Sequence, residues 1–175
     1  WAIGQVAAEL QRWRALGFGD MPIAVNVSAL QLRREDVARR LAAAVESAQV
    51  RPSLLEVELT ESGVMSDPAQ AIEILHQIHA LGMTIAIDDF GTGYSSLAYL
   101  KRFPISVLKI DRAFVKDLPG APKEAAICSA VLDMARHLGL SVVAEGVETE
   151  DQLGWLQARD CRYIQGYLTG KPMPA

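Results

Sequence analysis

Apolar and polar positions along this 175-residue chain are ordered in a way that predicts helices interleaved with short strands. Three times, a helical segment ends in Leu-Gly, a short apolar run follows, and a polar residue closes the run. The three copies are "ALGFGDMPIAVNVS", "ALGMTIAIDDFG" and "HLGLSVVAEGVE". Their glycines, Gly17, Gly82 and Gly139, suit the left-handed position that ends a helix. Repeated units of helix, glycine and strand predict an α/β fold with a parallel sheet.

Helical spacing of apolar residues predicts the helices. An apolar stripe runs from Ile3 to Trp13, Pro68 suits the first turn of a helix, and Gln152 completes a capping box. The expected helices begin at Trp1, cover about 69–81 and about 123–138, and run from Thr149 toward Arg159.

Six short runs are predicted to be strands: "IAVNVS", "LLEVELT", "TIAID", "VLKID", "SVVAE" and "YIQG". Side chains alternate along a strand, so each run has an aliphatic face and a second face that turns polar near its C-terminal end. Ile85 and Ile87, for example, oppose Asp88. This pattern predicts a (β/α)8 TIM-like barrel with helices outside and chemistry at the C-terminal rim. The alternative, a doubly wound open sheet, would bury both strand faces and make these polar residues costly.

The number of strands bears on domain organisation. A closed barrel of this type has about eight strands in about 250 residues, and only six are predicted here. We therefore expect residues 1–175 to form a single domain that is incomplete at the N-terminus, a fragment lacking the first strands and the final helix.

The composition argues against several classes of protein. Seventeen Lys+Arg against 21 Asp+Glu give a net charge of −4, which lacks the basic footprint of a DNA or RNA binder. The two cysteines, Cys128 and Cys161, form neither a disulfide framework nor a metal-binding spacing, and Cys128 is expected to be a small buried residue. The absence of a signal peptide and of a long apolar run predicts a soluble segment.

Polar residues collect at the predicted strand ends: Asn26, Glu58, Asp88, Asp89, Lys109, Glu145 and Gln165. In a barrel they converge on one rim. Carboxylate and amide oxygens suit Mg²⁺ or Mn²⁺, and the lack of His or Cys argues against zinc. Two adjacent acids disfavour each other's charge unless positive charge lies nearby, and they can serve two metals, as in phosphate ester hydrolysis. Lys109 is equally compatible with a salt bridge to Asp88 or Glu145 and with a catalytic role.

Two other features have simpler interpretations. His76 and His79 are predicted to be surface residues of an outer helix. The "GTGYSS" stretch lacks the P-loop lysine and is interpreted as a mobile rim loop, with Gly91 and Gly93 supplying backbone freedom.

The motifs "NVS", "ELTES", "DDFGTGYSS", "LKIDRAFV", "AEGVE" and "QGY" occur in the order and spacing of the EAL-domain family. The chain thus resembles bacterial cyclic di-GMP phosphodiesterases built on a modified (β/α)8 barrel. The resemblance implies a metal-dependent hydrolase that converts cyclic di-GMP to linear pGpG in second-messenger signalling, including biofilm control, with two Mg²⁺ or Mn²⁺ per site. It also implies a cytoplasmic domain, a homodimer, and fused sensor or cyclase domains in a parent protein whose membrane anchoring is left open.

The resemblance also implies roles for individual residues. The metal ligands would be Asn26, Glu58, Asp88, Asp89 and Glu145. Residues with a catalytic part at the attacking water and phosphate would be Lys109, Glu145 and Gln165. Glu61 would anchor the "DDFGTGYSS" loop, which is implicated in dimer-linked control. Asp111 and Glu148 would be substrate or site contacts.

The chain departs from the family pattern in one respect, because it contains no Glu-Ala-Leu triplet. In the family that glutamate is a metal ligand, and both it and a nearby substrate-binding arginine would precede Trp1. We expect an active parent domain, but weak or no activity from this exact chain. The alternatives are a non-catalytic cyclic di-GMP receptor, an aldolase-like enzyme with a Schiff base at Lys109, and a signalling module acting through the loop after Asp89.

Overall fold

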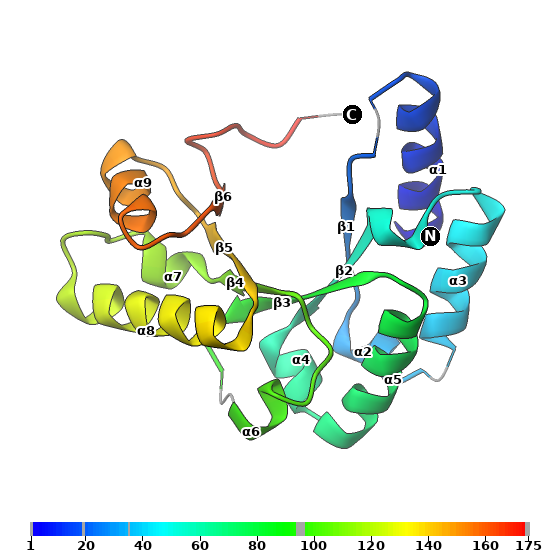
Figure 1. Cartoon of the computed structure of the whole chain (residues 1–175), viewed down its shortest axis with the longest axis horizontal. Coiled ribbons are helices and arrows are strands. Elements are labelled where there is room, and N and C mark those ends of the chain that lie inside the picture. The colour runs from blue at the N-terminus through cyan, green and yellow to red at the C-terminus, as the bar shows by residue number, and fades with distance from the viewer. Residues whose placement is uncertain (1, 19, 35, 94–96, 174–175) are drawn as a thin grey trace. The chain divides into compact units, whose positions relative to one another are not determined.

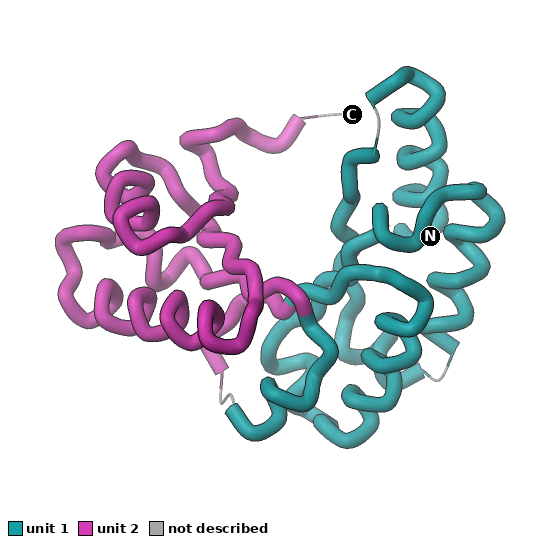
Figure 2. The backbone as a smooth tube through the Cα atoms, viewed as in Figure 1, with its two compact units in different colours: residues 1–86, 94–105 teal, residues 87–93, 106–175 magenta. Residues whose placement is uncertain are grey.

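The computed structural model describes residues 2–18, 20–34, 36–93 and 97–173. The chain divides into two compact units, drawn in different colours in Figure 2. Unit 1 comprises residues 1–86 and 94–105, and unit 2 comprises residues 87–93 and 106–175. The expectation of one domain over 1–175 stays a prediction.

All six predicted strands are present, and helices separate them along the chain (Figure 1). They are β1 (Ile23–Asn26), β2 (Leu55–Thr60), β3 (Thr84–Phe90), β4 (Val107–Ile110), β5 (Ser141–Glu145) and β6 (Tyr163–Gln165). Within the sheet they follow chain order from β1 to β6. A doubly wound sheet reverses its strand order partway, so the observed order favours the barrel type. The described residues supply six strands, against about eight in a closed barrel.

Unit 1 is built around the parallel pair β1 and β2, in which Asn26 is aligned with Glu58. Its helices are α1 (Ala2–Ala15), α2 (Ala29–Leu32), α3 (Val37–Ser47), α4 (Glu61–Met65), α5 (Pro68–Ala80) and α6 (Leu97–Leu100), with a 3-10 turn η1 (Pro52–Leu54). Helix α1 contacts β1 and α3, and α3 contacts α5. The predicted stripe of α1 is buried at Ile3, Ala7 and Leu10, because these residues pack under the neighbouring elements.

Unit 2 is built around β4, β5 and β6, which pair in parallel in that order. Its helices are α7 (Arg112–Val115), α8 (Pro122–Leu138) and α9 (Glu150–Gln157). Helix α8 contacts β4 and β5, and every residue of β4 is buried. Cys128 of α8 is fully buried, as its apolar neighbours predict. Strand β5 pairs with β4 from Ser141 to Ala144, and with β6 from Val143 to Glu145.

Local signals placed the helix ends correctly. Gly17, Gly82 and Gly139 have φ values of +79°, +87° and +71°, as their position after a helix requires. The capping box of Thr149 and Gln152 opens α9, and a second box opens α2. The helices α2, α4, α6 and α7 were not predicted, because four or five residues are too few to show helical periodicity.

Two further predictions concern surfaces and loops. His76 and His79 are exposed on α5, as expected for an outer helix. Gly91 has a φ of +99°, but Tyr94–Ser96 lie outside the described residues, so the predicted mobility of this loop stays a prediction. Among the helices of the described residues, none combines the length and the low charge content that a membrane span needs.

Candidate metal centre and active site

The end of β3 brings two acidic side chains together. Consecutive residues of a regular strand face opposite sides, which would separate Asp88 from Asp89. Asp89 instead has a φ of +55°, a left-handed conformation that Asp adopts more readily than most residues. Its backbone N–H donates a 3.0 Å hydrogen bond to Oδ1 of Asp88. This local break in the strand alternation allows both carboxylates to serve one site.

Lys109 supplies the positive charge that two adjacent acids require. Its ammonium nitrogen lies 3.3 Å from Oδ1 of Asp88 and 2.8 Å from Oε1 of Glu145. Lys109 sits in the middle of β4, and only 5% of the residue is exposed. The sequence left open a salt bridge to Asp88 or to Glu145, and the structure contains both. The lysine thus joins the end of β3 to the end of β5 inside a buried setting, where ion pairs are less screened by solvent.

The carboxyl of Asp89 has a raised pKa. Burial raises its pKa above the ordinary value, the negative charges of Asp88 and Asp111 raise it further, and a hydrogen bond with Asp111 acts in the same direction. The charge of Lys109 opposes these effects. The local field at Asp89 is therefore negative, which is the environment that attracts a cation.

The carboxylates fit a divalent metal. Asp88, Asp89 and Glu145 each offer one oxygen, and these oxygens all lie within 4.8 Å of one another. The cluster contains neither His nor Cys, so its chemistry is that of hard oxygen ligands and favours Mg²⁺, Mn²⁺ or Ca²⁺ over zinc. The three residues come from the ends of β3 and β5, as the strand pattern predicted.

A pocket of about 230 Å³ adjoins Glu145 at the ends of β5 and β6. Gln165 pairs in register with Glu145 and lines this pocket together with Glu148. Asp111 caps α7 by accepting a 2.7 Å hydrogen bond from the backbone N–H of Ala113, and it interacts with Asp89. Unit 2 therefore brings together six of the predicted site residues besides Lys109: Asp88, Asp89, Asp111, Glu145, Glu148 and Gln165.

Unit 1 contains the remaining candidates. Asn26 and Glu58 are register partners at the ends of β1 and β2, and only 7% of Glu58 is exposed. Glu61 is 1% exposed in the first turn of α4, where a carboxylate is favoured by the helix dipole. Their membership of the same site, and the anchoring of the loop by Glu61, stay predictions.

Four residues of the pocket were not predicted from the sequence: Arg112, Gly146, Gly166 and Tyr167. Arg112 forms a 2.8 Å ion pair with Glu148. Gly146 has a φ of +68°, and a Cβ added to it would clash with Cγ of Arg112. The position of Gly146, directly after Glu145, was the available signal, because a glycine beside a site residue often marks a close approach of another chain segment.

Comparison with known proteins gives the following relatives. A family model described as EAL domain matches residues 1–172. The bifunctional diguanylate cyclase/cyclic di-GMP phosphodiesterase MucR of Pseudomonas aeruginosa is 45% identical over 175 residues, which is all of this chain and 26% of that protein. The cyclic di-GMP phosphodiesterase NbdA of the same organism is 40% identical over 174 residues, 99% of this chain and 22% of that protein. The chain spans about a quarter of the length of these curated relatives.

Solved structures resemble the whole described fold. The PaMucR phosphodiesterase in its c-di-GMP complex has a TM-score of 0.95 at 45% identity, covering 99% of this chain and 70% of that one. Klebsiella pneumoniae BlrP1 in a manganese/cy-diGMP complex has a TM-score of 0.84 at 33% identity, covering 95% of this chain and 43% of that one. A calcium complex of BlrP1 is also similar.

Proposed function

The chain belongs to the EAL domain family, and on that premise we propose that it hydrolyses one phosphodiester bond of cyclic di-GMP to give linear pGpG. The observation that carries this proposal is the trio of carboxylates from Asp88, Asp89 and Glu145, with Lys109 paired between two of them. Carboxylate oxygens that can bind metal ions, beside a buried ammonium group that can stabilise negative charge, suit the hydrolysis of a phosphate ester. The names of MucR and NbdA support the choice of substrate.

Divalent cations, Mg²⁺ or Mn²⁺ at two per site, are part of the proposal. Asp88, Asp89 and Glu145 would hold them. Asn26 and Glu58 join this ligand set on the strength of their positions at the ends of β1 and β2. Bound there, such cations stabilise charge on phosphate oxygens and lower the pKa of water. The manganese and calcium complexes of BlrP1 support a site of this type.

The reaction needs water and one proton transfer. A water oxygen attacks phosphorus, the bond from phosphorus to the ribose 3′-oxygen breaks, and the leaving oxygen takes up a proton. Glu145 and Gln165, paired in register, would orient the water, and Glu145 could accept its proton. Lys109 would donate a hydrogen bond to the oxygens on which negative charge increases. Asp111 and Glu148 would contact the substrate from the ends of β4 and β5.

The remaining parts of the proposal concern assembly. Glu61 would anchor the loop that follows Asp89, and this loop would link activity to a homodimer. The parent protein would be a bacterial signalling protein with further sensor or cyclase domains, and this domain would act in the cytoplasm. The short coverage of the relatives, 26% of MucR, supports such additional domains.

The test measures the conversion of cyclic di-GMP to pGpG in the presence of Mg²⁺ or Mn²⁺. The pGpG product is detected by chromatography. The assay is run on the chain itself and on a version extended upstream with a Glu-Ala-Leu segment. We expect faster turnover from the extended version, and loss of turnover in Asp88→Ala, because a missing ligand weakens metal binding. A parallel binding titration with cyclic di-GMP is included.

Each outcome has a separate meaning. Turnover that depends on metal and on Asp88 supports the phosphodiesterase. Binding of cyclic di-GMP without turnover by either version would replace it with a receptor. Trapping of a carbonyl compound on Lys109 by borohydride would point to Schiff-base chemistry, which the two ion pairs of the ammonium disfavour.

A further inference from the structure

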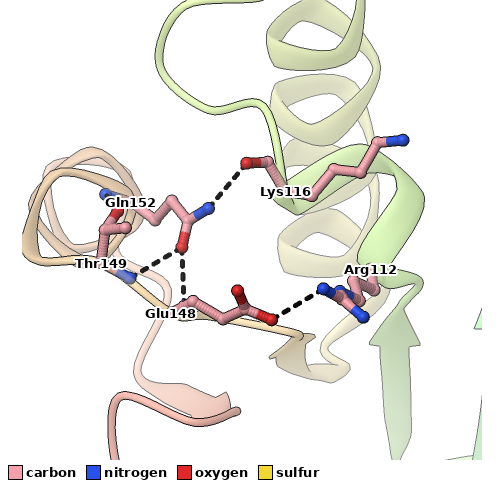
Figure 3. Close-up of polar contacts among 5 residues, drawn as sticks. All are labelled: Arg112, Lys116, Glu148, Thr149 and Gln152. Carbon is pink, nitrogen blue, oxygen red and sulfur yellow. Dashed lines mark hydrogen bonds and ion pairs between the residues drawn. The ribbon is translucent and has the colours of Figure 1, made fainter.

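The buried side chain of Gln152 in unit 2 makes three hydrogen bonds. Its Oε1 accepts hydrogen bonds from the backbone N–H groups of Glu148 at 2.7 Å and Thr149 at 3.0 Å. Its Nε2 donates a 2.8 Å hydrogen bond to the backbone carbonyl of Lys116, 36 residues earlier in the chain (Figure 3). Only 4% of Gln152 is exposed. The side chain therefore caps its own helix and also bonds a segment that is distant in the sequence.

The bonds of Gln152 join two segments that both follow strands carrying site residues. The segment from Gly146 to Thr149 follows β5, which ends at Glu145, and α7, which ends at Val115, follows β4. Strand β4 carries Lys109, and its ammonium pairs with Glu145 at 2.8 Å. The link from Gln152 to the Lys116 carbonyl thus fixes the connection after Glu145 against the connection after Lys109.

A second contact reinforces the same junction. Arg112 of α7 pairs with Glu148, as Figure 3 shows, and the stem of Arg112 lies over Gly146. The Arg112–Glu148 pair is exposed, with side-chain exposures of 61% and 40%, and exposed pairs contribute little to stability. The Gln152 link is buried, where leaving its partners unsatisfied is costly. The glutamine is therefore the stronger of the two connections.

We propose that Gln152 is a positioning residue for the metal centre, which holds Glu145 in the geometry that places its carboxylate beside Asp88, Asp89 and Lys109. This inference rests on the proposed function in one respect, because it assigns the cluster to divalent cations. Direct hydrogen-bond partners of metal ligands typically change metal affinity about 10- to 100-fold when they are replaced, and Gln152, which acts on Glu145 through the backbone after it, is expected at the low end of that range. The role assigned to Gln152 goes beyond the capping box, which satisfies only the start of α9.

Gln152→Glu separates the two roles. Glutamate, like glutamine, completes a capping box, and its carboxylate still accepts from the N–H groups of Glu148 and Thr149. It has no N–H to donate to the Lys116 carbonyl. The matched control is Gln31→Glu in the capping box of α2, where the glutamine accepts from the N–H of Ser28 at 2.9 Å. Both variants introduce the same charge at the same position of a capping box.

The first measurement is Mn²⁺ affinity without substrate, by titration calorimetry or by the EPR signal of free Mn²⁺. We expect Gln152→Glu to weaken Mn²⁺ binding about tenfold, although an added negative charge by itself would strengthen it. Gln31→Glu should bind Mn²⁺ as the unsubstituted protein does. Amide hydrogen exchange at Glu148 and Thr149 should stay protected in Gln152→Glu, which verifies that the cap remains.

Three outcomes distinguish the hypotheses. Weakened Mn²⁺ binding with a protected cap supports the positioning role. Unchanged Mn²⁺ affinity in Gln152→Glu, with turnover of the unsubstituted protein intact, would overturn the positioning role and leave the phosphodiesterase in place. An unsubstituted protein, extended upstream, that neither binds Mn²⁺ nor hydrolyses cyclic di-GMP would overturn both.

Discussion

The two units differ in the reach of the side-chain hydrogen bonds that their described residues make. In unit 1, the side chains of Ser28, Thr60 and Asp67 each accept from a backbone N–H three residues ahead. The hydrogen bond from Arg14 to the Gln49 carbonyl spans 35 residues, but it lies at the surface. In unit 2, Gln152 spans 36 residues from a buried position. Local caps shape a helix, whereas a buried long-range bond fixes one segment against another, and the candidate metal cluster lies in the same unit as the bond of Gln152.

The largest expected effect comes from removing the long-range ion pairs of Lys109. Lys109→Met should lower cyclic di-GMP turnover about 100-fold or more, because a donor to the developing phosphate charge is lost. Thermal stability should also fall, since Asp88 and Glu145 lose this ammonium. Mn²⁺ should restore part of the melting temperature but not the turnover. Lys123→Met, at an exposed position of α8, is the control, and turnover within tenfold of the original would contradict the role of Lys109.

The next effect compares two left-handed glycines. Gly146 has a φ of +68° and faces Arg112, whereas Gly139 has a φ of +71° and open space, with no neighbouring atom within 4 Å of the place where a Cβ would lie. Gly146→Ala should cost about 4 kcal/mol, from left-handed strain plus overpacking, and Gly139→Ala about 1.5 kcal/mol from strain alone. Urea unfolding measures both. Equal losses would show that Arg112 moves aside freely and that this contact carries no constraint.

The third prediction compares the two capping glutamines by stability. Gln152→Leu should lower the free energy of unfolding by about 3 kcal/mol, because two buried N–H groups and one carbonyl lose their partner. Gln31→Leu should lower it by about 0.5 to 1 kcal/mol, since its bonds are exposed and water replaces them. Urea unfolding followed by circular dichroism gives both values. Equal losses in the free energy of unfolding would show that burial does not make the hydrogen bonds of Gln152 more costly to lose.

The smallest expected effect concerns the reactivity of the two cysteines. Both lie in unit 2, so their labelling reports on the unfolding of that unit alone. Burial raises the pKa of Cys128 to about 12 and also raises the pKa of Cys161. A raised thiol pKa in the folded state gives stability that is present below the unfolded pKa of 9.0 and is lost as pH rises toward 12. Thiol labelling should therefore be slow at about pH 8, below the ordinary thiol pKa, and should accelerate with unfolding of unit 2. Rapid labelling of Cys128 in native conditions would show that unit 2 opens readily.

Local patterns were sufficient to predict much of the fold. The strands, the glycines after the helices and the capping box of Thr149 each depend on residues close in sequence, and each was found. Polar residues at strand ends also indicated the acidic cluster, because parallel strands bring their C-terminal ends to one edge. The pairing of Lys109 followed from the same reasoning, although its sharing between Asp88 and Glu145 became evident only in the folded chain.

Long-range and conformational features were not predictable in the same way. The sequence did not indicate that Asp89 adopts a left-handed backbone, because the predicted strand ends at Asp88 and the pattern leaves the conformation of the next residue open. The contact of Arg112 with Gly146 depends on how α7 lies against the end of β5, which a single sequence does not encode locally. The capping box predicted that Gln152 bonds within its own helix start, but it gave no sign of the bond to Lys116.

The partner of Gln152 is a backbone carbonyl, and this has a consequence for how the contact is read in families of sequences. Substitutions at position 116 change a side chain but leave the carbonyl in place, so no compensating residue pair arises. Covariation methods detect contacts by correlated changes at two positions. At position 116 the bonded group is the backbone carbonyl, so changes of its side chain need not follow changes at position 152. In an alignment, the hydrogen bond from Gln152 to the Lys116 carbonyl would therefore be visible only as a restricted choice of residue at position 152.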